Sequence, residues 1–238
     1  MTVAKLVSKT TIDDIYLEQL IDENPPENET DLLFFNNMKS NPEQLMIFIA
    51  RVSSPNQLNP SYEKLLKYCW DHGHFSVFEQ VTCTFEVETD LNVATQLLRH
   101  RSFTFQQFSR RYNSATPEFI SLAPRLQDTK NRQNSIETND DELDAWFAMA
   151  QHNVHLNCMR YYEEAIEKGI AKEVARYLLP TSTKTKLYVT GNLRSFLHYC
   201  QVRCKVDTQK EHRDLAIAIQ KQLCYNFPTT SKALGWKL

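Results

Sequence analysis

The chain has 238 residues, of which 42% are hydrophobic and 24% charged, and its formal net charge is −2. This is the composition of an ordinary globular protein, and it excludes disordered and collagen-like chains. The weak negative charge disfavours a dedicated nucleic-acid-binding protein, because such proteins are usually strongly basic. The four glycines exclude a glycine-rich phosphate loop, which needs three of them close together.

Hydrophobic spacing predicts the regular elements in chain order. In the first third of the chain, we expect a strand over residues 4–9, a helix over 10–22, a loop over 24–30, a helix that starts at Asn41-Pro42-Glu43, and a helix over 61–72 that ends at Gly73. Further on, we expect strands over 81–87 and 184–190 and helices over 91–100, 140–168, 171–179, 192–205 and 209–226, the last two closing the chain.

Strands mixed with helices, without regular βαβ units, indicate the α+β class, as a single domain over residues 1–238. Residues 125–141 contain almost no apolar side chain, so we expect a polar surface loop or insertion there. The helix over 140–168 carries an apolar stripe with a 3.6-residue period, which predicts one packed face.

No apolar run reaches the ~20 residues that cross a bilayer, and the N-terminus lacks the apolar core of an export signal. The six cysteines form no Cys-x-x-Cys pair, so we expect reduced thiols, a cytoplasmic protein, and no membrane partner. Cys200 and Cys204, with His198 nearby, imitate a metal cluster. Small buried side chains on an amphipathic helix are the preferred interpretation, and we expect no metal site.

Residues 91–116 contain no Asp, Glu or Lys but include Arg99, Arg101, Arg110 and Arg111. Exposed helical arginines usually have carboxylates three or four residues away, so this stretch departs from the average of the chain. Arginine binds phosphate bidentately and stacks on flat rings. The three phenylalanines of residues 102–109 can line a ring-binding slot or fill the core. A solvated basic face is the alternative interpretation of the whole segment.

A second set of arginines lies near the C-terminus. Arg176 is flanked by Val174, Leu178 and Leu179, which we expect to be buried, so Arg176 is placed near a helix end that packs inside. Arg194 and His198 share one helix face at about 100° per residue. Together these residues indicate a second wall of a site for an anionic ligand.

The segment Arg99–Ser109 resembles the RHR-x7-S signature of the flavin-dependent thymidylate synthases. Thr104 stands where serine is usual in that family, Gln106 where asparagine is usual, and Gln107 where many members have glutamate. Further blocks of the family match in order, from about residue 45 to 220: Ala-Arg-Val-Ser at 50–53, His-Gly-His at 72–74 with Phe78-Glu79, Glu-Val-Ala-Arg at 173–176, Asn192-Leu193-Arg194-Ser195, and Arg203 followed by Gln209-x-Glu211.

This resemblance implies an α+β subunit with an antiparallel or mixed sheet flanked by helices, no Rossmann fold, and a homotetramer with active sites at subunit interfaces. It implies the methylation of dUMP to dTMP, with 5,10-methylenetetrahydrofolate as carbon donor and NADPH-reduced FAD as hydride donor. Because the flavin carries the hydride chemistry, the protein needs only to stack and orient rings. No cysteine nucleophile is expected.

The resemblance also implies the roles of individual residues. The residues expected to bind FAD are Ser53, His74, Ser76, Arg99, His100, Arg101 and Gln107, with Asn192, Arg194 and His198 from another subunit. The residues expected to bind dUMP are Gln96, Arg99, Gln107, Ser109, Arg110, Arg111, Arg176 and Arg203. Arg203 is the expected catalytic residue, because it would favour the ionised form of the uracil ring. Ser109 is expected to bind phosphate or base, since no His/Asp pair at motif spacing supports nucleophilic attack.

Two other functions remain as alternatives. A nucleic-acid-binding module would use the Arg/Phe segment for backbone contact and base stacking, and its binding would weaken steeply with salt. A metal-dependent hydrolase would use His72, His74 and His100 and would lose activity with chelators. A yellow colour and a flavin spectrum in the purified protein would separate these alternatives from a flavoenzyme.

Overall fold

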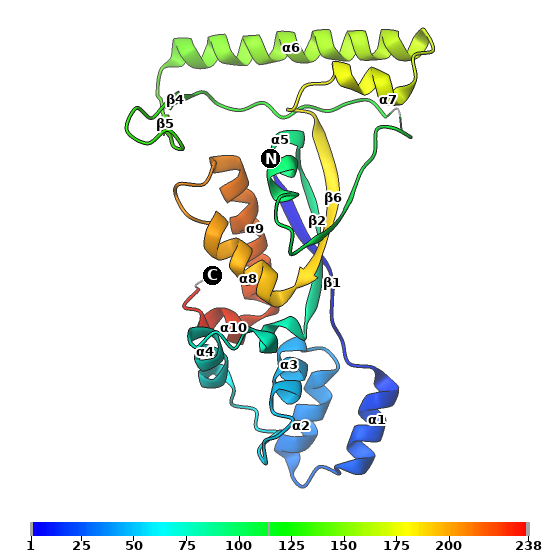
Figure 1. Ribbon diagram of the computed structural model, residues 1–238, viewed down its shortest axis with the longest axis vertical. Coiled ribbons are helices and arrows are strands. Elements are labelled where there is room, and N and C mark those ends of the chain that lie inside the picture. Colours follow the sequence, from blue (N-terminus) through cyan, green and yellow to red (C-terminus); the bar gives the residue numbers. More distant parts are fainter. Residues whose placement is uncertain (1, 114, 237–238) are drawn as a thin grey trace.

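A four-stranded antiparallel sheet with the strand order β1-β2-β6-β3 runs through the middle of the molecule (Figure 1). Its strands are β1 (Val3–Lys9), β2 (Thr82–Asp90), β6 (Lys184–Asn192) and β3 (Thr104–Gln107). The structure, a computed structural model, describes residues 2–113 and 115–236. The predicted α+β class is confirmed, and within these residues every pairing of the sheet is antiparallel, unlike the parallel sheet of a Rossmann fold.

The two central strands bury one face and expose the other, as the two-residue period of a strand requires. Phe85 and Val87 of β2 are buried opposite their partners Val189 and Leu187 of β6. The other face is charged: for example, Nζ of Lys186 lies 3.1 Å from a carboxylate oxygen of Glu88.

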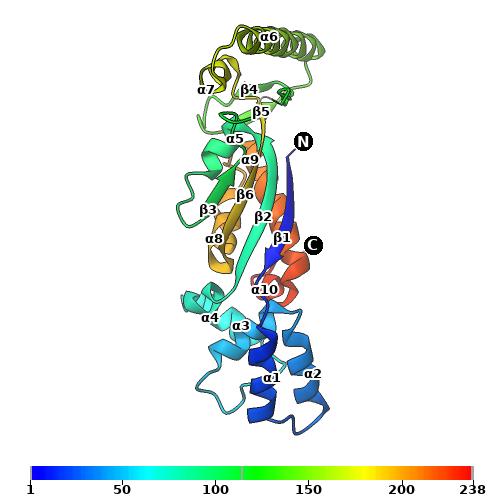
Figure 2. The same ribbon diagram turned by 90° about the vertical axis from the view of Figure 1, so that its right-hand side faces the viewer.

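Four helices cover the buried face of the sheet: α5 (Leu91–Leu97), α8 (Leu193–Arg203), α9 (Lys210–Asn226) and α10 (Pro228–Ala233) (Figures 1 and 2). The aromatic rings of Phe196 in α8 and Phe85 in β2 lie 4.8 Å apart at the centre of this core. Leu215 and Ile219 of α9 pack into the same core. The expectation that the helices over 192–205 and 209–226 close the chain is wrong, because α10 follows them. It begins at Pro228, which is tolerated in a first turn.

A helical unit occupies one end of the molecule (Figure 2). It comprises α1 (Asp14–Glu23), α2 (Glu29–Met38), α3 (Pro42–Ala50), α4 (Glu63–Asp71) and the 3-10 helix η1 (Phe75–Glu79). Helices α1, α2 and α3 share a separate apolar core around Leu17, Phe35 and Phe48. Helix α2 was not predicted from the sequence, and its first residues lie in the loop expected over 24–30. As predicted, Gly73 follows α4, and it adopts a φ of 73°.

The opposite end carries the long helix α6 (Asp141–Glu167), α7 (Lys172–Ala175) and the 3-10 helix η2 (Arg176–Leu178) (Figure 1). Helix α6 begins and ends close to the predicted bounds. Its apolar stripe is only partly packed: Tyr162 is buried, whereas Trp146, Val154 and Tyr161 are 58%, 51% and 50% exposed. The expectation of one packed face is therefore wrong for most of this helix within a single chain.

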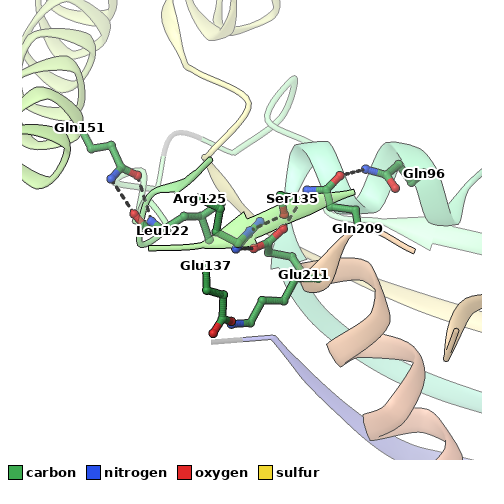
Figure 3. Close-up of polar contacts among 9 residues, drawn as sticks. Gln96, Leu122, Arg125, Ser135, Glu137, Gln151, Gln209 and Glu211 are labelled. Atoms are coloured by element: carbon green, nitrogen blue, oxygen red, sulfur yellow. Dashed lines mark hydrogen bonds and ion pairs between the residues drawn. The ribbon is translucent and has the colours of Figure 1, made fainter. Parts of the chain in front are cut away.

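Residues 125–141, expected as a polar loop or insertion, contain a two-stranded hairpin of β4 (Arg125–Gln127) and β5 (Ser135–Glu137). Gln151 of α6 holds the segment that leads into it, because its side chain exchanges two hydrogen bonds of 2.9 Å with the backbone of Leu122 (Figure 3). None of the helices that the structure describes combines the length and apolar character needed to cross a membrane.

Candidate functional site

Helix α5 and the turn after it set the position of the first arginines. The carboxylate of Asp90 caps this helix by accepting a 2.8 Å hydrogen bond from the backbone N–H of Val93. Beyond the helix, Phe103 enters the core, with its ring 4.5 Å from that of Phe196. The Phe103 ring also lies so close to Gly191 that a Cβ there would approach it to 2.5 Å. Anchored in this way, the turn leaves Arg99 and Arg101 exposed.

The three phenylalanines of the arginine segment divide between the two roles considered for them. Phe103 is buried in the core, and Phe105 is half-buried against it. Phe108 is 38% exposed and lines a cavity of about 280 Å³. One of the three side chains is thus available to contact a flat ligand ring.

That cavity, the Arg176 cavity, gathers four of the residues expected to bind dUMP. Its lining consists of Leu91, Gln107, Phe108, Ser109, Arg110, Arg176, Leu179 and Thr185. Gln107 Nε2 donates a 3.2 Å hydrogen bond to Thr185 Oγ1, which fixes its amide at the wall. The side chain of Arg110 donates to the carbonyl of Ala115 at 2.9 Å.

The environment of Arg176 differs from the sequence prediction. Val174 and Leu178 are exposed and Leu179 is only half-buried, so the expected packing around Arg176 is wrong. Helix α7 is a single turn that continues into η2, and it is too short to bury an apolar face. An ion pair of 3.4 Å between Arg111 and Glu173 joins this turn to the arginine segment.

A second cavity, the Arg194 cavity, of about 480 Å³, lies where α8 meets η1 and is lined by Trp70, Phe75, Glu79, Ser102, Asn192, Arg194, Ser195, His198 and Gln201. Asn192 caps α8 by accepting a 2.9 Å hydrogen bond from the backbone N–H of Ser195. The Arg194 guanidinium lies 4.7 Å from the centre of the Phe75 ring and pairs with the Glu79 carboxylate. Arg194 and His198 share one face, as predicted. This wall of aromatic rings and a cation suits a flat, anionic cofactor.

A third group of residues surrounds Arg203. Its Nε donates a 2.9 Å hydrogen bond to Nε2 of His100. Burial, together with the charges of Arg203 and His198, lowers the pKa of His100 to about 4. The ring of the fully buried His212 lies 6.1 Å from that of His100. Burial, with the charges of Arg203 and His100, lowers the pKa of His212 to about 4 as well. Both histidines are therefore neutral at pH 7.

Gln96 joins this group through a chain of polar contacts (Figure 3). Its Nε2 donates to Oε1 of Gln209 at 2.6 Å, and Nε2 of Gln209 donates to Glu211 at 2.9 Å. Glu211 pairs with Arg125 of β4 at 2.7 Å. On its other side, Oε1 of Gln96 lies 3.2 Å from Nδ1 of His212.

The structure does not bring all predicted site residues together within one subunit. Ser53 lies in the exposed turn after α3, and His74 and Ser76 are exposed beside Phe75. The predicted residues outside both cavities are Ser53, His74, Ser76, Gln96, Arg99, His100, Arg101, Arg111 and Arg203. Within residues 2–113 and 115–236, no three His, Cys, Asp or Glu side chains are placed to hold a metal ion.

The cysteines pack as small apolar side chains. Cys69, Cys83, Cys200 and Cys224 are buried and Cys204 is half-buried. Burial raises the pKa of Cys83 to about 12, so this thiol stays protonated. None of the six is among the residues that line the two cavities.

The sequence analysis assigned no role to five residues of the site. Glu79, Gln209 and Glu211 stand in the matched family blocks, so a signal existed for them. For His212 the only signal is its position next to Glu211. Arg125 had no signal, because it lies in a polar segment without a motif and reaches Glu211 only through the fold.

Comparisons with known proteins identify the family of the chain. The family model described as "Thymidylate synthase complementing protein" matches residues 35–229. A flavin-dependent thymidylate synthase of Synechocystis sp. is 51% identical over 195 residues, covering 82% of this chain and 90% of that protein. A probable flavin-dependent thymidylate synthase of Paramecium bursaria Chlorella virus 1 is 45% identical over 196 residues, covering 82% of this chain and 91% of that protein.

A solved structure supports the fold. The UMP/dUMP methylase PolB of Streptomyces cacaoi, bound with 5-Br UMP, superimposes with a TM-score of 0.76 at 22% identity and covers 99% of this chain and 94% of that one. The family model spans most of the chain, and two relatives exceed 40% identity over four fifths of it. This chain therefore belongs to the family of flavin-dependent thymidylate synthases.

Proposed function

We propose that this protein is an enzyme that methylates dUMP to dTMP, with 5,10-methylenetetrahydrofolate as carbon donor, FAD as bound cofactor and NADPH as reductant. The observation that carries the proposal is the Arg176 cavity, in which Gln107, Ser109, Arg110 and Arg176 line one space. An amide, a hydroxyl and two guanidinium groups suit a ligand with a polar base and a phosphate. The names of the two relatives support the same activity.

FAD fits the Arg194 cavity by its chemistry. The rings of Trp70 and Phe75 offer flat apolar contact, and Arg194 offers charge for a phosphate or for the edge of a flavin ring. Asn192 and His198 line the same space. When bound, the reduced flavin supplies the hydride that completes the methyl group.

The role proposed for Arg203 is to activate uracil. A guanidinium is a cation, and a cation beside the ring stabilises the deprotonated base. His100 orients this group, because its neutral Nε2 accepts the hydrogen bond from Arg203 Nε at 2.9 Å. No covalent step by a cysteine or serine of the enzyme is required.

We further propose that the active site is completed by other copies of the chain in a homotetramer. The predicted dUMP residues fall into separate places on one subunit, with Arg176 in its cavity and Arg203 outside it. The exposed Trp146, Val154 and Tyr161 of α6 supply apolar surface that a second copy would bury. A cytoplasmic location and independence from nucleic acid and membranes also belong to this proposal.

The proposal is tested by assaying dTMP formation from dUMP with purified protein. Omission of dUMP, methylenetetrahydrofolate or NADPH, or removal of FAD from the protein, is each expected to abolish the product. Product formation without flavin or without the folate would contradict the proposal. Salt-sensitive binding to single-stranded DNA by a colourless protein would favour the nucleic-acid alternative instead.

A further inference from the structure

The carboxylate of Glu211 determines the orientation of two neighbouring amides. A carboxylate only accepts hydrogen bonds, so Gln209 must point Nε2 toward Glu211 and Oε1 toward Gln96. Gln96 must then donate from Nε2, which turns its Oε1 toward Nδ1 of His212. One ionised group thus fixes two amide orientations and the tautomer of His212.

This arrangement determines which hydrogen-bonding groups of the Gln96 amide remain for a ligand. A glutamine amide has two N–H donors and an oxygen with two lone pairs. Gln209 takes one donor and His212 takes one lone pair. Among residues 2–113 and 115–236, no side chain takes the remaining N–H and the remaining lone pair, and their positions are fixed. A flipped amide would exchange donor and acceptor, so this constraint decides what Gln96 can recognise.

Arg125 keeps Glu211 ionised although the pair is nearly buried, with 17% of the Arg125 side chain and 10% of the Glu211 side chain exposed. Burial alone would raise the pKa of Glu211, and the hydrogen bonds from Arg125 and Gln209 hold it below its ordinary value. Loss of Arg125 would leave a buried carboxylate without a countercharge. Such a group takes up a proton, and a protonated carboxyl no longer dictates the orientation of Gln209.

The β4–β5 hairpin contacts the start of α9 at two places, and only one of them is linked to Gln96. The hairpin has a second tie to the start of α9, an ion pair between Glu137 of β5 and Lys210 (Figure 3). This pair is more exposed, and neither residue hydrogen-bonds to Gln209 or Gln96 in the described part of the chain. It therefore offers a matched control, with the same two elements but no link to Gln96.

We propose that Arg125, Glu211 and Gln209 are positioning residues that fix the amide of Gln96 for recognition of the pyrimidine nucleotide. Arg125 of β4 is thereby part of the nucleotide site, although it stands in a segment that the sequence marks only as a polar loop or insertion. This inference rests on the proposed function, because it takes Gln96 to contact dUMP.

The test is a double-mutant cycle on the full-length, flavin-loaded enzyme. Glu211→Gln removes the acceptor-only group, and Gln209→Leu breaks the chain of hydrogen bonds while the buried Glu211 keeps its partner Arg125. Each is expected to raise the KM for dUMP by about tenfold, the worth of one hydrogen bond of this kind, with a smaller effect on kcat. Glu137→Gln is the control and leaves the KM unchanged. Flavin content and thermal unfolding verify that each variant is folded.

The decisive comparison repeats both substitutions in a Gln96→Ala background. If the chain acts through Gln96, each then changes the KM by less than about twofold. An undiminished tenfold effect in that background, or an equal effect of Glu137→Gln, would overturn the inference and leave the proposed function intact. An active enzyme whose KM is unaffected by Gln96→Ala would also overturn the inference alone. A wild-type protein that forms no dTMP would overturn both.

Discussion

The Nε–H of Arg203 donates a hydrogen bond to Nε2 of His100 at 2.9 Å, which requires that this nitrogen carry no proton. The low pKa of His100, about 4, agrees with that requirement. The partner of Arg203 is therefore a neutral, half-buried imidazole ring, and this hydrogen bond orients the guanidinium. His100, which the family resemblance assigns to FAD binding, thus contacts Arg203, the residue expected to activate uracil, within one subunit.

Removal of the Arg203 cation is expected to abolish most of the activity. We expect Arg203→Ala to lower kcat for dTMP formation by about 100-fold or more, the usual cost of losing one charge-stabilising donor. Lys205→Ala removes an exposed cation two residues away and serves as control. Steady-state assays measure kcat for variants that retain a normal amount of flavin. A near-wild-type kcat in Arg203→Ala would contradict the activating role.

Arg176 is expected to contribute mainly to binding. A charge-assisted hydrogen bond is worth about 1.5–3 kcal/mol, so Arg176→Ala should weaken dUMP binding by about 10- to 100-fold. Lys39→Ala, just after α2, removes an exposed cation whose Nζ lies 3.6 Å from the carboxylate of Asp14, and this variant should bind dUMP as the wild type does. Calorimetric titration measures both. Equal affinities for the two variants would refute the assignment of the Arg176 cavity to the nucleotide.

The buried His212 makes stability depend on pH. Its pKa of about 4 in the folded protein lies below the ordinary value of 6.5, so the unfolded chain binds the proton more tightly. Its contribution to the free energy of unfolding is thus complete above pH 6.5 and is lost as pH falls toward 4.

The substitution His212→Asn removes this titration and keeps a donor for Gln96. The loss of unfolding free energy between pH 7 and pH 5 is expected to shrink by about 1–2 kcal/mol in this variant. Urea unfolding at fixed protein concentration measures the difference. An unchanged loss would show that His212 is not a buried neutral group.

The sequence was sufficient for the parts of the fold that local patterns determine. The alternation of β2, the proline at the start of α3 and the glycine after α4 each depend on nearby residues, and all three predictions are confirmed. The burial expected for the neighbours of Arg176 is wrong, because α7 is a single turn, and Val174 and Leu178 remain 56% and 44% exposed.

Candidate site residues could be predicted from the sequence where they stand in the family blocks. Contacts between segments that are distant in the sequence could not be predicted. The grouping of Gln107 with Arg176 in one cavity joins residues from two distant blocks, and both were candidates from the motif alone. The contact of Arg125 with Glu211 spans β4 and α9. No spacing rule connects a polar hairpin with a helix 86 positions later, and only the fold shows that contact.

The exposed apolar side chains of α6 are expected to support assembly. Trp146→Glu places a charge in this surface and should shift the protein from the proposed tetramer to smaller species, with loss of activity at shared sites. His152→Glu, about 240° around the helix from Trp146, is the control and should leave the mass unchanged. Light scattering after size-exclusion chromatography reads the mass. A monomeric wild-type protein with full activity would contradict the shared site.

The most direct test of the proposed function is a single turnover of the chemically reduced, flavin-containing protein mixed with dUMP and methylenetetrahydrofolate in the absence of oxygen and NADPH. The flavin is expected to be reoxidised, with one dTMP formed per flavin. Reduced flavin that stays reduced while dTMP forms, or a purified protein that holds no flavin yet makes dTMP, would contradict it.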